Sequence, residues 1–166
     1  MNREELTKLF EKLGAREPEN WASSQIERGI NQLGRYLFLR QVWREVIAED
    51  DRDWINAEIE WSKKNEGAPC SGIGPALERV LGKGAEAKDL TEIVRVMQYR
   101  LLFRICYLLS DPSIEEAELE NFGWGLFQIN DNGEVVGSID CLHESLLEMD
   151  PTGREMRPRK DSDSHP

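Results

Sequence analysis

Residues 89–110 read DLTEIVRVMQYRLLFRICYLLS, a strongly apolar stretch that ends at Asp111-Pro112. Asp89 and Glu92 have the spacing of a capping box, which predicts that a helix begins there. Apolar residues then recur three or four positions apart, the period of one helix face, at Ile93, Val94, Met97, Leu101, Ile105 and Leu108. We therefore expect a mainly α fold, a helical bundle around a central helix over about residues 89–110.

Shorter helices are expected before this segment. The first covers about residues 3–13, with Asn2 as its N-cap and Gly14 as its stop. Further helices are predicted over about 20–49, over 51–64, and from Pro75 to about Gly82, with a loop at 65–74. Gly29 and Gly34 interrupt the second of these helices, and we interpret them as places where another helix approaches closely.

The pattern changes after residue 111. Ser113 and Glu116 predict a short acidic helix over about 113–120, and the residues after it alternate as in a β-hairpin over about 124–140. A three-residue loop, Asp131-Asn132-Gly133, collects Phe127, Ile129, Val135 and Ile139 on one face. An isolated hairpin is marginal in water, so we expect this face to pack on the helices. A last helix is expected over about 141–149, with Leu142, Leu146 and Met149 directed inward.

The length of 166 residues predicts a single domain over residues 1–153, followed by a polar, mobile tail over 154–166. The three cysteines, Cys70, Cys106 and Cys141, cannot all pair with one another, which favours a reducing compartment. No apolar run approaches the roughly 18 residues that span a bilayer, and the N-terminus lacks a signal-peptide pattern. These features predict a cytoplasmic protein with no membrane partner.

The net charge of −11 excludes proteins that bind nucleic acid nonspecifically through phosphate contacts. Segment 111–150 holds eleven of the 32 acidic residues and no lysine or arginine, so the remaining residues are electrically balanced. Two interpretations stay open. The acids are neutralised by arginines of the earlier helices, or they form an exposed face for a basic partner. The candidate arginines are Arg35, Arg40, Arg44, Arg95, Arg100 and Arg104.

Catalytic and metal-binding patterns are sparse. His143, flanked by Asp140 and Glu144, is the one candidate for nucleophilic or acid–base catalysis outside the tail, and a structural role for it is favoured. No Cys-x-x-Cys pair is present, and a calcium loop around Gly133 would place Gln128 and Ile139 where carboxylates are required. We therefore predict no metal and no cofactor.

The favoured hypothesis is a noncatalytic binding protein whose acidic C-terminal region engages a basic protein partner, comparable in charge alone with inhibitors and immunity-type proteins. The expected partner-binding residues are Glu115, Glu116, Glu118, Glu120, Trp124, Asp131 and Glu134. One alternative is a small enzyme with its site near His143. Another is a self-associating helical protein that uses a cluster of Trp43, Trp54 and Trp61.

Overall fold

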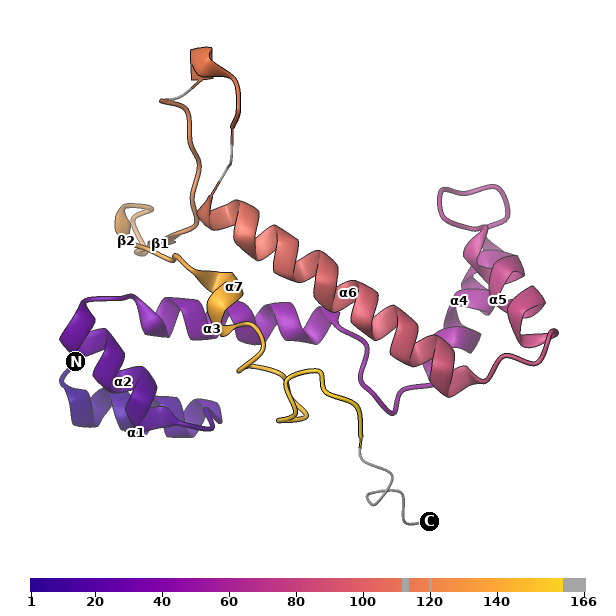
Figure 1. Ribbon diagram of the computed structural model, residues 1–166, viewed down its shortest axis with the longest axis horizontal. Coiled ribbons are helices and arrows are strands. Elements are labelled where there is room, and N and C mark those ends of the chain that lie inside the picture. Colours follow the sequence, from indigo (N-terminus) through magenta and orange to yellow (C-terminus); the bar gives the residue numbers. More distant parts are fainter. Residues whose placement is uncertain (112–113, 120, 160–166) are drawn as a thin grey trace. The chain divides into compact units, whose positions relative to one another are not determined.

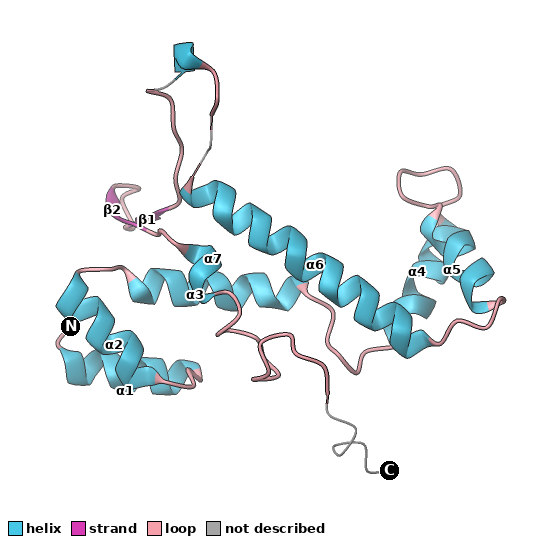
Figure 2. Cartoon of the chain, viewed as in Figure 1, coloured by secondary structure: helices cyan, strands magenta, loops and turns pink. Residues whose placement is uncertain are grey.

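The computed structural model describes residues 1–111, 114–119 and 121–159, and it is mainly helical with one two-stranded antiparallel hairpin near the C-terminus (Figure 1). This confirms the predicted fold class. The elements are α1 (Arg3–Leu13), α2 (Pro18–Arg28), α3 (Gln32–Val42), η1 (Trp43–Glu45), α4 (Asp53–Lys64), α5 (Ile73–Leu81), α6 (Ala87–Ser110), η2 (Ala117–Leu119), β1 (Phe127–Ile129), β2 (Val135–Ser138) and α7 (Leu142–Ser145). Figure 2 colours helices and strands separately.

The chain forms two compact units. The first contains residues 1–43 and the chain from residue 102 onward, and the second contains residues 44–101. Helix α6 therefore contributes its beginning to the second unit and its end to the first. The expectation of one domain over residues 1–153 stays a prediction.

Helix α1 has the boundaries that its sequence predicts. The Asn2 side chain accepts a hydrogen bond from the Glu5 backbone N–H, and the Glu5 carboxylate accepts one from the Asn2 backbone, both at 2.9 Å. At the other end, Gly14 adopts a left-handed conformation with φ of 84°. Both ends of the helix thus satisfy their backbone groups locally.

The prediction of a single helix over residues 20–49 is wrong, because the helix ends at Arg28 and a new one begins at Gln32. Gly29 adopts a left-handed φ of 67° and caps α2, with no neighbouring atom close to the position of a Cβ. Asn31 then caps α3 by accepting a hydrogen bond from the backbone N–H of Gly34. These two glycines serve helix ends rather than a close helix contact.

The core of the first unit centres on three aromatic rings from three helices. The Phe10 ring centroid lies 5.9 Å from that of Trp21 and 5.5 Å from that of Tyr36, and the last two centroids are 5.4 Å apart. The Tyr36 hydroxyl donates a hydrogen bond to the carbonyl of Leu13 at the end of α1. Burial raises the pKa of Tyr36 despite the opposing charge of Arg40. The cluster therefore fastens α1, α2 and α3 together.

A second buried group joins α3 and η1 to the C-terminal region. Leu39, Trp43, Leu142 and Leu146 are buried, and the Trp43 indole N–H donates a hydrogen bond to the Leu146 carbonyl at 2.9 Å. The inward positions predicted for the last helix are therefore confirmed for the two leucines. The α-helix itself covers Leu142–Ser145 only, and the residues after it form turns instead of continuing to residue 149.

The second unit packs α4 against α5 through Ile55, Ile59 and Leu77. The backbone N–H of Gly74 donates to the Ser62 hydroxyl at 3.0 Å, and a Cβ on Gly74 would lie 2.5 Å from the Ser62 Cβ. This glycine is therefore required by the close approach of the two helices.

Helix α6 is fastened to the second unit by buried polar groups. The Thr91 hydroxyl accepts a hydrogen bond from the Trp54 indole and donates one to the Asp51 carbonyl, both at 2.9 Å. The Arg95 guanidinium donates to the Ile47 carbonyl at 2.8 Å. Both Thr91 and Arg95 are buried. The buried face of α6 is thus in part polar.

The helix predicted over 89–110 is confirmed as α6, but its expected buried stripe is not. Ile93, Met97 and Leu101 are 59%, 57% and 60% exposed, and Ile105 and Leu108 are exposed as well. The buried residues of α6 are Thr91 and Arg95 in the second unit and Cys106 in the first, and they lie on a different face of the helix. The apolar pattern correctly predicted which residues share a face but not where that face lies.

Cys106 is buried and free, as its sequence context predicts, and burial raises the pKa of its thiol to about 11. At pH 8 about one thiol in a thousand is therefore ionised. We expect iodoacetamide to modify the exposed Cys70 of the folded protein at that pH and to leave Cys106 intact until guanidinium chloride is added. Peptide mass mapping measures both sites, and equal labelling of the two cysteines in the folded protein would contradict this account.

The prediction of an acidic helix over about 113–120 is also wrong for the described residues 114–119. The three residues of η2 form a short 3-10 turn, and residues 114–116 are not helical. Ser113, the predicted cap, lies outside the described residues. Among the helices that are described, none combines the length and the apolar character needed to cross a membrane.

Candidate docking surface

The hairpin has the turn that its sequence predicts. The backbone N–H of Asn130 donates to the Glu134 carbonyl at 3.0 Å, which closes a loop over residues 131–133. Gly133 takes the left-handed position in this loop, with φ of 81°. The Asn130 side-chain oxygen also accepts hydrogen bonds from the backbone N–H groups of Asn132 and Glu134. The turn is therefore fixed by its own residues.

The hairpin faces the opposite way from the prediction. The Gln128 side-chain oxygen accepts a hydrogen bond from the Asn31 amide at 2.9 Å, and Gln128 pairs with Gly137 in the sheet. Because neighbouring residues of a strand point to opposite faces, Phe127 and Ile129 are turned away from Asn31. The expected packing of Phe127, Ile129 and Val135 on the helices is therefore wrong, and only Ile139 of that group is buried.

The outward side of the hairpin and the segment before it carry large exposed apolar side chains. We call this set the hairpin face, and it consists of Phe122, Trp124, Phe127, Ile129, Val135 and Val136. Ile129 pairs with Val135 across the sheet, and these side chains are 62% and 64% exposed. The register shifts after Gln128, which breaks the regular alternation. Sequence reasoning identified Trp124, but it assigned Phe127, Ile129 and Val135 to the core because they alternate with polar residues.

Trp124 is held in place although it is half exposed. Its indole N–H donates a hydrogen bond of 2.7 Å to the carbonyl of Leu108 near the end of α6. Its ring centroid lies 6.4 Å from that of Phe122. The polar edge of the ring is thus satisfied within the first unit, while its apolar faces stay available for contact.

Most of the predicted partner-binding acids are exposed and unpaired. Within the described residues, Glu115, Glu116, Glu118 and Asp131 are exposed and make no ion pair, and the Glu134 carboxylate accepts a hydrogen bond from Asn130. Glu120 lies outside the described residues. Asp131 and Glu134 lie at the tip of the hairpin, so negative charge borders the hairpin face.

Two acids at the end of the acidic segment, Glu148 and Asp150, are surrounded by other parts of the fold. Asp150 is buried, and its carboxylate accepts hydrogen bonds from the backbone and hydroxyl of Thr152 and from the backbone of Met156. The beginning of the predicted mobile tail is therefore held by Asp150, and residues 160–166 of that tail lie outside the described part of the chain. Burial raises the pKa of Glu148, and nearby Glu17 adds to this while Arg16 opposes it.

Neutralisation by arginines is limited in the first unit. Arg35 is buried and donates a hydrogen bond to the Ser145 hydroxyl at 3.4 Å, which brings its charge near the end of the acidic segment. Its charge also opposes the rise in the pKa of Glu148. Among the described residues, no ion pair joins Arg40 or Arg104 to an acid of segment 111–150. Within the described residues, the acids bordering the hairpin face are therefore not paired with these two arginines.

His143 lies among aromatic rings. Its ring centroid is 5.8 Å from that of Phe103 and 5.0 Å from that of Tyr107, both in edge-to-face contacts. In the described part of the chain, its buried Nδ1 has no hydrogen-bond partner, and Asp140 instead accepts a hydrogen bond from Ser138 at 2.6 Å. Within the described residues no hydrogen bond or ion pair joins the imidazole to a carboxylate, and the enzymatic alternative gains no support from these contacts.

The three tryptophans of the proposed cluster differ in burial. Trp43 is buried beside Leu146, Trp54 is half-buried and bonded to Thr91, and Trp61 is exposed. A metal centre is equally unsupported, because the described residues contain no group of three or more potential ligands that lie together.

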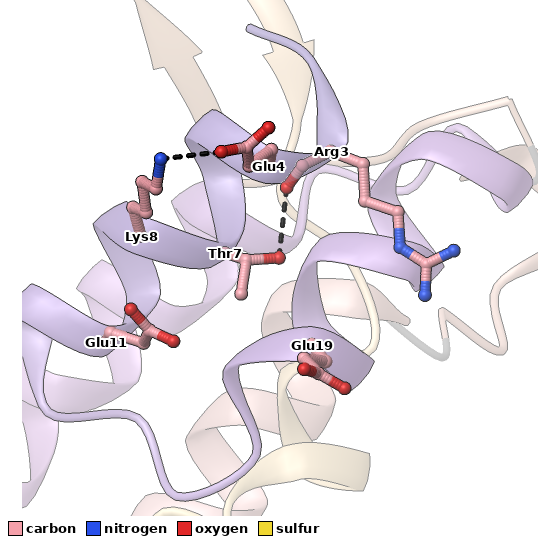
Figure 3. Close-up of a pocket in the computed structure, with 6 residues that line it drawn as sticks. All are labelled: Arg3, Glu4, Thr7, Lys8, Glu11 and Glu19. Atoms are coloured by element: carbon pink, nitrogen blue, oxygen red, sulfur yellow. Dashed lines mark hydrogen bonds and ion pairs between the residues drawn. The ribbon is translucent and has the colours of Figure 1, made fainter.

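A hollow in the first unit is lined by charged residues of α1 and α2 (Figure 3). In this hollow the Lys8 amine pairs with the Glu4 carboxylate at 2.6 Å, and the Thr7 hydroxyl donates to the Arg3 carbonyl at 3.0 Å. The charged residues of its lining lie on exposed helix surfaces, so the hollow is unlike the concave and mostly apolar sites that bind small molecules.

Comparison of the chain with protein-family models, with curated proteins and with solved structures gives no match.

Proposed function

We propose that this protein is a noncatalytic binding protein whose hairpin face and bordering acids engage a basic partner that also carries apolar side chains. The observation that supports this most is that exposed Ile129 and Val135 share one hairpin with the exposed acid Asp131, in a segment that holds further exposed acids such as Glu116 and no base. Large apolar side chains grouped on a surface commonly mark interaction sites, and the acids would select and steer a positively charged partner.

The geometry of the hairpin agrees with such a role. A two-stranded sheet leaves both strand edges unpaired, and it gains stability when a further segment packs on its apolar face. The Gln128–Asn31 hydrogen bond and the self-contained turn hold the hairpin in place before any partner arrives. A preorganised surface of this kind loses little conformational entropy on binding.

The proposal is tested with a synthetic peptide of alternating lysine and valine. We expect it to bind the full chain in isothermal titration calorimetry, with affinity that falls as salt is raised. Replacing Glu116 and Asp131 with lysine should weaken binding about tenfold, and Ile129→Thr with Val135→Thr should weaken it further without changing the salt dependence. Threonine is used because it retains the preference for strands.

The matched control is the double variant Glu11→Lys and Glu66→Lys, which changes the net charge equally at exposed positions outside the acidic segment. It should bind the peptide nearly as well as the unmodified chain at moderate salt. Equal binding at low and high salt, or equal weakening by both charge-reversal variants, would contradict a specific acidic docking surface. So would the absence of any binding.

A further inference from the structure

Helix α6 carries a second exposed apolar surface, separate from the hairpin face. We call it the α6 stripe, and it consists of Ile93, Met97 and Leu101, each more than half exposed and one turn apart. Stripes of this kind on a regular helix are suited to pairing with another helix. The proposed basic partner does not account for this surface, because the charges beside the stripe include two arginines.

The charges beside the α6 stripe change sign along the helix. Asp89 and Glu92 precede the middle of the stripe, and Arg100 and Arg104 follow it. All four are exposed. With 3.6 residues per turn, Arg104 lies within the stripe and Asp89 and Arg100 flank it on one side, whereas Glu92 points about 140° away from Met97. Among the described residues, none of the four takes part in an ion pair. The surface is therefore complementary to itself when one copy is reversed.

We propose that two copies of this chain associate through the α6 stripe as an antiparallel helix pair, with Met97 on the two-fold axis. In this register Ile93 of one copy packs against Leu101 of the other. Residue 104 lies level with residue 90 of the other copy, so Arg104 comes beside Asp89. The two-fold axis brings the same flank of both helices together.

The charges favour this register over two alternatives. In a parallel pair the two-fold axis runs along the helices, so the charged flank of one copy faces the opposite flank of the other and Asp89 does not meet Arg104. An antiparallel pair centred on Leu101 would also match apolar positions, but it would bring Arg100 of one copy beside Arg104 of the other. The register centred on Met97 combines apolar matching with opposite charges. One helix pair buries less than the roughly 1,600 Å² of a standard interface, so we expect a micromolar dissociation constant.

The first test uses sedimentation equilibrium of the full chain between about 1 µM and about 1 mM. We expect a monomer–dimer equilibrium, and we expect Met97→Glu and Met97→Lys each to be monomeric, because each places like charges opposite one another at the axis. An equimolar mixture of the two variants should form a heterodimer. Glutamate and lysine are good helix formers, and circular dichroism verifies that the variants stay folded.

The second test fixes the orientation. Arg104→Glu and Asp89→Lys should each raise the dissociation constant about tenfold, because each places like charges side by side across the antiparallel pair. The double variant should restore the dissociation constant, because residues 89 and 104 then carry opposite charges again. Val80→Glu, an exposed apolar position on α5, is the matched control and should leave the dimer intact.

A chain that is monomeric at every concentration would overturn this proposal, and so would a dimer that survives Met97→Glu. A mixture of the two Met97 variants that stays monomeric, or a double charge swap that fails to restore dimerisation, would overturn the antiparallel register. These readouts are independent of peptide binding at the hairpin face.

Discussion

Replacing Phe10 with alanine is expected to lower the free energy of unfolding of the first unit by about 3–5 kcal/mol. Phe10 is fully buried, and its ring lies between Trp21 and Tyr36 at centroid distances of 5.9 and 5.5 Å. The substitution removes two aromatic contacts and leaves a cavity where α1, α2 and α3 meet. The surrounding rings are large and rigid, so they refill the space poorly.

The loss is measured by guanidinium unfolding followed through near-ultraviolet circular dichroism, which reports the packing of aromatic side chains. Ile26→Ala on α2 is the control, because Ile26 is about half exposed and lies outside this cluster. It should cost less than about 1 kcal/mol. A Phe10→Ala variant that is destabilised no more than Ile26→Ala would show that the aromatic cluster does not hold these helices together.

Local signals in the sequence predicted several elements closely. Asn2 and Gly14 delimit α1, and Asp111-Pro112 follows the end of α6, because each of these residues acts on the backbone beside it. The three-residue hairpin loop was predicted for the same reason. Its last position requires a left-handed backbone conformation, which glycine adopts without the steric cost that other residues have. Such effects extend over a few residues and need no knowledge of distant contacts.

The break between α2 and α3 shows how one local signal can be hidden by another. Apolar spacing continues from Ile26 through Leu33, which favours one long helix. Gly29 followed by Asn31 is nevertheless a helix stop followed by a new cap, and this pair of signals was available in the sequence. Weighing periodicity above capping led to the wrong boundary.

The candidate site could be predicted only in part. The acidic segment and Trp124 follow directly from the sequence, but the exposure of Ile129, Val135 and the α6 stripe does not. Periodicity shows which side chains share a face, and burial depends on what packs there. The hydrogen bond between Asn31 and Gln128 joins residues that lie far apart in the sequence. The orientation of the hairpin in which this bond forms cannot be read from any local sequence pattern.

Asp150→Asn is expected to release the C-terminal turn and to cost about 2–4 kcal/mol of local stability. One carboxylate oxygen accepts hydrogen bonds from the Thr152 hydroxyl at 2.7 Å and the Met156 backbone at 2.8 Å, and the other accepts from the Thr152 backbone at 3.1 Å. Asparagine replaces one of these oxygens with an amide group that can only donate. At least one buried donor then loses its acceptor, whichever way the amide is oriented.

Amide hydrogen exchange measures this directly, and the amide of either Met156 or Thr152 should lose most of its protection in the variant, according to which oxygen the amide group replaces. Asp140→Asn is the matched control, because Asp140 is exposed and accepts a hydrogen bond from Ser138, and it should leave the protection of both amides intact. Unchanged protection at both Thr152 and Met156 would refute the structural role of Asp150. Segment 111–150 thus contains two kinds of acidic residue. Asp150 acts through buried hydrogen bonds that stabilise the fold, whereas the exposed Asp131 is expected to affect partner binding and not stability.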